Sequence, residues 1–85
     1  MSEEMIGTVS DFFAHPVVAG IELTAVLKIG DKIHIKGHTT ELEMTVDSMQ
    51  IDNAQVTEAK PGDSIGVKVR DRVRSGDKVY KITGQ

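Results

Sequence analysis

Apolar and polar residues alternate with a period of two along most of this chain. Apolar side chains occupy the odd positions of residues 17–23 and 32–36, and the even positions of residues 41–47. They return to the odd positions in residues 65–70. Successive side chains of a β-strand point to opposite faces of a sheet, so each segment predicts a strand with one buried and one solvated face.

Two further segments, residues 6–13 and 78–82, alternate less regularly and are also expected to form strands. The apolar phase changes near Asp47 and Ser48, because Met49 stands at an odd position after a run of even ones. A β-bulge there would shift the side-chain parity and bend the strand. Bent strands allow a small sheet to close on itself.

The composition agrees with a single small β domain. Ten Val, eight Ile and seven Thr outnumber three Leu and five Ala, and β-branched residues are typical of strands. No segment has the 3.6-residue period of a helix, although residues 53–58 fit either a helical turn or a short strand. The 85 residues suffice for one domain, residues 1–85. We expect its core at about residues 6–82 and loose ends at residues 1–4 and 83–85.

Three Gly-Asp pairs mark turns that precede strands. A basic residue stands two positions before each glycine, and a β-branched residue two positions after each aspartate. The pairs are Gly30-Asp31, Gly62-Asp63 and Gly76-Asp77. Glycine adopts positive φ without steric cost, and an aspartate carboxylate accepts hydrogen bonds from nearby backbone N–H groups.

The sequence offers little for catalysis, metal binding or nucleotide binding. It has no cysteine, which excludes disulfides and zinc–thiolate sites. Residues 60–64 have the residue types of a phosphate-binding loop but not their order, and nothing brings a serine, a histidine and an aspartate together. His15, His34 and His38 are expected to be exposed strand or loop residues, with His15 and His38 as weak candidates for ligand contact. We therefore expect no enzyme activity, no cofactor and no metal.

Charge is divided unevenly along the chain. Residues 1–59 carry a net −7 and residues 60–85 a net +4. This split either marks an anionic partner or is a chance feature of a small surface. No apolar run approaches the ~18 residues that span a bilayer, and residues 1–5 do not resemble a signal peptide, so we expect a cytoplasmic protein without a membrane partner.

Four basic residues of one parity dominate the positive part. They are Lys68, Arg70, Arg72 and Arg74. On a straight strand they would follow one face at intervals of roughly 6–7 Å, comparable with the phosphate spacing of a nucleic acid. The alternative to a straight strand is a turn at Asp71, which interrupts the apolar parity. The alternative to a nucleic-acid partner is a charged strand edge that resists aggregation. Tyr80 is the only nearby aromatic residue, so no base-stacking platform is evident.

Several segments resemble the second, β-barrel domain of translational GTPases, such as elongation factor Tu, its archaeal counterpart and initiation factor two. In chain order they are residues 7–9, 27–33, 46–50, 59–67 and 73–77. The chain is most similar to small stand-alone translation elongation factor-like proteins of archaea. Residues 38–40 and 48–50 are also similar to the C-terminal barrel of U32 peptidase-like proteins.

The resemblance implies a closed, mainly antiparallel barrel of six or seven strands. In the GTPases this domain hydrolyses nothing. It helps to hold the aminoacyl end of tRNA, contacts ribosomal RNA or packs against the G domain. Since this chain has no G domain, the resemblance implies neither a GTP cycle nor nucleotide binding here.

Two functional hypotheses follow. The first is a non-catalytic module that binds tRNA, rRNA or a translation-related ribonucleoprotein through Lys68, Arg70, Arg72 and Arg74, with Lys36 and His38 as secondary contacts. The second is a protein-interaction module that docks on a separate enzyme or GTPase, such as a translation or RNA-modifying protein. Its expected contacts are Phe12, Phe13 and Val17.

Overall fold

The computed structural model describes residues 2–14, 17–38 and 40–83, and within these ranges every regular element is a strand. The strands are β1 (Ser2–Ala14), β2 (Val17–Leu23), β3 (Leu27–Lys28), β4 (Lys32–Lys36), β5 (Glu41–Thr45), β6 (Met49–Ile51), β7 (Ala54–Val56), β8 (Glu58–Ala59), β9 (Ser64–Lys68) and β10 (Lys78–Thr83). The all-β class predicted from the alternation is confirmed. Residues 53–58 contain strand β7 and the start of β8, not a helical turn.

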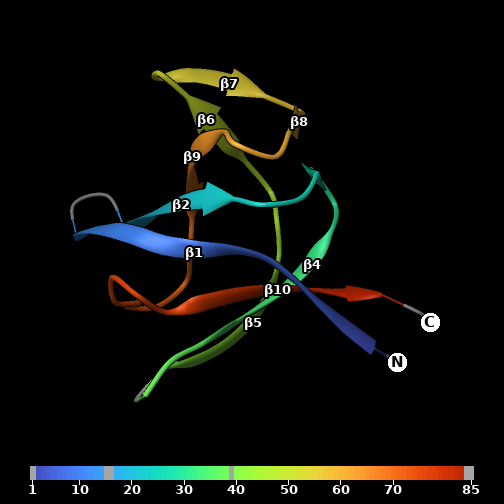
Figure 1. Ribbon diagram of the computed structural model, residues 1–85. Helices are drawn as coiled ribbons and strands as arrows, with labels where there is room; N and C mark the ends of the chain where they lie inside the picture. Colours follow the sequence, from blue (N-terminus) through green and yellow to red (C-terminus); the bar gives the residue numbers. More distant parts are fainter. Residues whose placement is uncertain (1, 15–16, 39, 84–85) are drawn as a thin grey trace.

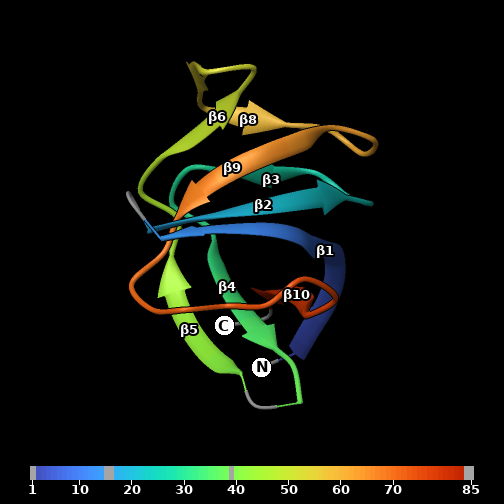
Figure 2. The same ribbon diagram turned by 90° about the vertical axis from the view of Figure 1, so that its left-hand side faces the viewer.

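Eight strands form one antiparallel sheet in the order β5–β4–β10–β1–β2–β9–β6–β7, and β3 pairs with β8 in a separate ladder. The long strand β1 serves two neighbours, since its first half pairs with β10 and its second half with β2 (Figure 1). Strands β4 and β5 lie at one end of the molecule and β6, β8 and β9 at the other (Figure 2).

The closed barrel of six or seven strands is wrong. The chain leaves β5 at one edge of the sheet and enters β6 near the other edge through residues 46–48. Val46 hydrogen-bonds with the backbone of Gly30 and Asp31 at 2.9 Å each, at a turn and not in a ladder. Among the described residues no ladder pairs β5 with any strand other than β4, so the sheet stays open. The expected bulge near Asp47 is instead the break between two strands.

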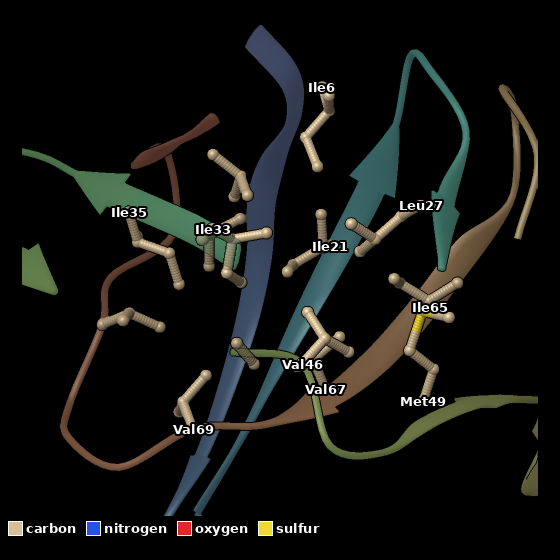
Figure 3. Packing of buried hydrophobic residues seen from close by; sticks show 14 of the residues in the cluster. Ile6, Ile21, Leu27, Ile33, Ile35, Val46, Met49, Ile65, Val67 and Val69 are labelled. Atoms are coloured by element: carbon tan, nitrogen blue, oxygen red, sulfur yellow. The ribbon is translucent and has the colours of Figure 1, made fainter. Parts of the chain in front are cut away.

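Burial follows the predicted alternation. Ala19, Ile21 and Leu23 of β2 are buried, and so are Ile65 and Val67 of β9. The change of phase is also confirmed, because burial passes from even positions up to 46 to odd position 49. The buried side chains of both ends of the sheet converge on one interior (Figure 3).

The three Gly-Asp turns form as predicted. Gly30, Gly62 and Gly76 have φ of 94°, 92° and 95°. Each aspartate carboxylate accepts a hydrogen bond from the backbone N–H three residues earlier, at 2.9, 2.8 and 2.9 Å. Strands β4, β9 and β10 begin directly after these turns.

The N-terminal residues 2–4, expected to be loose, lie in β1 and pair with β10. Ser2 Oγ lies 2.9 Å from Thr83 Oγ1, so the two ends of the described chain are adjacent. Residues 1, 84 and 85, which were also expected to be loose, fall outside the described residues. Within the described ranges no helix has the length and apolar character that crossing a membrane requires.

Candidate functional site

The predicted basic strand ends at Lys68. Residues 69–77 form an irregular loop, and Val69 and Val73 anchor it by pointing into the core, 4% and 1% exposed. The chain turns around Asp71, whose carboxylate accepts a hydrogen bond from the Arg72 N–H at 2.7 Å. The arrangement with four cations along one straight strand is therefore wrong, and the turn left open at Asp71 is the one that forms.

Two of the three arginine side chains in this loop contact the protein itself. The Arg70 guanidinium donates a hydrogen bond to the Glu43 carbonyl of edge strand β5. The Arg72 guanidinium lies 5.8 Å from the centre of the Phe12 ring, a cation–π distance. The backbone of Arg74 closes the Gly-Asp turn by hydrogen bonds with Asp77. All three side chains are exposed, but those of Arg70 and Arg72 contact different strands, β5 and β1.

Arg72 and Arg74 share a groove of about 270 Å³ with Glu41 and Asp71. Two carboxylates beside two guanidinium groups leave the groove without a net charge. A polyanion needs a surface with a net positive potential, so this geometry does not favour RNA.

The secondary candidates Lys36 and His38 lie at the end of β4 and just beyond it. Lys36 Nζ is 3.0 Å from Glu3 Oε1 and 5.3 Å from the centre of the Tyr80 ring. The hydrogen bond to Glu3 raises the pKa of Lys36 above its usual value. His38 is exposed and lines a shallow groove with Lys36 and Gly37. His15 falls outside the described residues.

His34 was expected to be exposed, but this is wrong, because it is only 9% exposed. Its Nδ1 lies 2.6 Å from Glu3 Oε2 and its Nε2 lies 3.4 Å from Glu41 Oε2. Hydrogen bonds from His34 and then Lys36 lower the pKa of Glu3. This cluster of Glu3, His34, Lys36 and Glu41, the carboxylate–histidine cluster, ties β1 and β5 to β4. Its carboxylates come from strands far apart in sequence, so no local pattern signals it.

The three predicted docking residues on the β1–β2 hairpin divide into two kinds. Phe12 and Val17 are half-buried and pack against the core. Phe13 is 55% exposed, more than any other large apolar side chain in the described part of the chain. Of the three, Phe13 therefore presents the most exposed side chain.

Phe13 lines a groove on the sheet, here called the glycine-floored groove, with a volume of about 600 Å³. Residues of β1, β2, β6 and β9 and of the β6–β7 turn surround it: Ser10, Asp11, Phe13, Val18, Gly20, Gln50, Asp52, Asn53, Ser64, Ile65 and Gly66. Gly20 and Gly66 pair directly across the β2–β9 ladder, so the floor carries no side chain there. The sequence gives no signal for this groove, since its residues come from four distant segments.

No group of three or more histidine, cysteine, aspartate and glutamate side chains in the described ranges could hold a metal ion. The carboxylate–histidine cluster contains no hydroxyl or thiol nucleophile, and both ring nitrogens of His34 face carboxylates. The cluster therefore lacks the nucleophile–base pair of a covalent hydrolase.

The chain is similar in sequence or structure to segments of proteins that are named proteases or peptidases. No protein-family model matches the chain. It is 50% identical over 78 residues to an uncharacterized protease of Methanocaldococcus jannaschii, a match that covers 91% of this chain but 19% of that protein. The chain thus spans about a fifth of the length of the curated relative it matches.

Two crystal structures of the C-terminal domain of a U32 peptidase from Geobacillus thermoleovorans have the same fold. Each superposes with a TM-score of 0.87, at 14% identity over 94% of this chain and at 15% over 92%; the matches cover 93% and 99% of those domains. Identities this low show the fold alone.

These matches overturn the translation-factor interpretation. The elongation factor-like identity, the translation role and the RNA-binding function are wrong, because both the related sequence and the matching structures are peptidase-like. Short Gly-Asp turns between strands serve many β domains, so they misled the assignment. The resemblance to U32 peptidase-like proteins is the part that the comparisons support.

Proposed function

We propose that this chain is a non-catalytic protein-docking module that acts with a peptidase-like protein. The observation that carries the proposal is Phe13, 55% exposed beside the glycine-floored groove. An exposed aromatic side chain next to a concave surface is the usual composition of an anchor at a protein interface.

The relatives support a partner of this kind. The matching segment is about a fifth of a longer protein that is named a protease, and the same fold has been crystallised as a separate domain of a peptidase. A domain with its own core is held to its neighbours by surface contacts. We infer that the corresponding contacts of this chain are made through the hairpin and groove around Phe13.

The test uses the Methanocaldococcus jannaschii protease from which the matching 78-residue segment has been deleted. Calorimetry should detect a one-to-one complex with the full chain, and Phe13→Ser should weaken it about tenfold, as expected for an interface anchor. The matched control is Ile29→Ser, since Ile29 is another exposed apolar residue, 39% exposed, that does not line the groove.

A second experiment covers the case in which the shortened protease does not fold, which circular dichroism would reveal. A photo-crosslinking residue is placed in the full-length protease at the position that aligns with Phe13. Crosslinks to the rest of the same molecule support docking by this face. Absence of both the complex and the crosslinks would refute the proposed function.

A further inference from the structure

The glycine-floored groove has a lining that no contact inside the described protein explains. Asp31, Asp63 and Asp77 accept backbone hydrogen bonds in turns. Asp11 and Asp52, the two carboxylates of the groove, have no cation within 4.0 Å and no side-chain hydrogen bond among the described residues. No basic residue lines the groove, so the two aspartates give its lining a net negative charge.

One of the two floor glycines, Gly66, is not required by the packing of the chain itself. A Cβ on Gly7 would lie 2.6 Å from the Glu22 carbonyl oxygen, so the packing requires glycine there. A Cβ on Gly66 would meet only the Val18 Cγ1 atom, at an ordinary 3.4 Å, and Gly66 does not have the positive φ of the turn glycines. Glycine inside a strand weakens it, and it is typical of sites where another backbone or a ligand approaches closely.

The exposed ring of Phe13 stands beside these carboxylates, in the same lining. A planar guanidinium stacks on aromatic faces and donates paired hydrogen bonds to carboxylates, whereas a lysine ammonium does neither as well. The neighbouring residue provides a precedent within this chain, since Arg72 lies over the ring of Phe12.

We propose that the glycine-floored groove binds an extended segment of the partner protein that carries an arginine. The segment's backbone lies across Gly20 and Gly66, and its guanidinium reaches the Phe13 ring and the carboxylates of Asp11 and Asp52. This inference rests on the proposed docking function and names the chemistry of the docked segment.

Nuclear magnetic resonance of the ¹⁵N-labelled chain tests it, with the peptide acetyl-Gly-Arg-Gly-amide as the ligand. Arginine peptide should shift the amide signals of Gly20, Asn53 and Gly66, with a Kd of the order of millimolar. The matching glutamine peptide should shift none of them. The double variant Asp11→Asn/Asp52→Asn should weaken binding about fivefold, the effect of two exposed ion pairs.

Glu58→Gln is the control for loss of a negative charge outside the groove, because Glu58 is an exposed acid of β8 that does not line it. It should leave the affinity unchanged. Gly66→Val should block the peptide, and the unchanged remainder of its spectrum would show that the sheet is intact.

The inference would be overturned by the absence of a shift at the groove, by an equal response to the glutamine peptide, or by an affinity that loss of both aspartates leaves unchanged. Shifts that depend on protein concentration without peptide would instead identify a second copy of the chain as the occupant, and would also overturn it. A Phe13-dependent complex with the shortened protease, without a response to the arginine peptide, would leave the docking function standing and refute only this inference.

Discussion

Charged and aromatic side chains occur at both ends of the sheet, but they differ in whether they contact partners within the described chain. Around β4, β5 and the loop 69–77, charged and aromatic side chains meet partners within the chain: Glu3 with His34, Lys36 with Tyr80, and Arg72 with Phe12. Around the glycine-floored groove, Phe13, Asp11 and Asp52 are not paired in this way among the described residues. Residue type is therefore a poor guide to function in this small domain. Whether a side chain already has a partner is the better one.

This comparison predicts that substitutions at the first end reduce stability and that substitutions at the groove reduce binding. The largest effect is expected at Gly37, where a Cβ would lie 1.9 Å from Asp77 Oδ1. Asp77 is 6% exposed and its other oxygen is held by the Arg74 N–H at 2.9 Å, so it cannot move away freely. Gly37→Ala should reduce the free energy of unfolding by about 2 kcal/mol, as overpacking does. Urea denaturation measures it, and a loss below the experimental error would show that this turn is adaptable.

His34 is expected to have the next largest effect. His34→Ala removes the group between the Glu3 and Glu41 carboxylates and should cost about 1.5 kcal/mol, because the part-buried hydrogen bond to Glu3 is lost and like charges remain. His34→Gln, which keeps a donor, should cost less. Thermal unfolding of both variants provides the measurement, and equal losses would mean that His34 contributes packing and not hydrogen bonds.

Substitution of Glu3 is expected to have a smaller effect on stability, and this effect depends on pH. The pKa of Glu3 is lowered in the folded chain by His34 and Lys36, so its contribution to stability is complete above the unfolded value of 4.5 and is lost as the pH falls through the folded value. The difference in Tm between the parent chain and Glu3→Gln should therefore be constant near neutral pH and disappear in acid.

The partner Lys36 has the opposite dependence. Its pKa is raised, so its contribution is complete below the unfolded value of 10.5 and is lost as the pH rises through the folded value. A gap between parent chain and Glu3→Gln that persists unchanged from neutral to strongly acid pH would contradict the role of Glu3.

Local features of the fold could be predicted from the sequence, and long-range ones could not. The period of two located buried residues such as Ile21 and Val67, and each Gly-Asp pair located a turn, because both features depend on neighbours in sequence. Prediction of the chain path after Lys68 depended on a single residue, Asp71. It indicated the turn, whereas the basic residues of one parity suggested a straight strand.

The sites depend on contacts between distant segments, and this is where prediction failed. The hydrogen-bond partner of His34 is Glu3, which lies 31 positions away in the sequence on β1. The floor of the groove carries no side chains where Gly20 of β2 pairs with Gly66 of β9, two residues far apart in the sequence. Phe13, Phe12 and Val17 were predicted together as docking residues, but Phe13 is exposed whereas Phe12 and Val17 pack on the core.

The smallest expected effect on stability belongs to Gly66, and it separates the two ends of the sheet most sharply. If the floor is bare to admit a partner, Gly66→Ala should leave the free energy of unfolding unchanged or raise it by about 0.5 kcal/mol, since alanine removes the entropic cost of glycine in a strand. The same variant should weaken binding to the shortened protease, because the added methyl group occupies the floor. Gly20 cannot replace Gly66 in this test, because a Cβ at Gly20 would lie only 3.3 Å from Asp11 Cβ and would itself disturb the packing. Paired urea denaturation and calorimetry of one variant thus suffice. A loss of stability comparable with that of Gly37→Ala would mean that Gly66, like Gly37, is required by the packing of the chain itself and not by a partner.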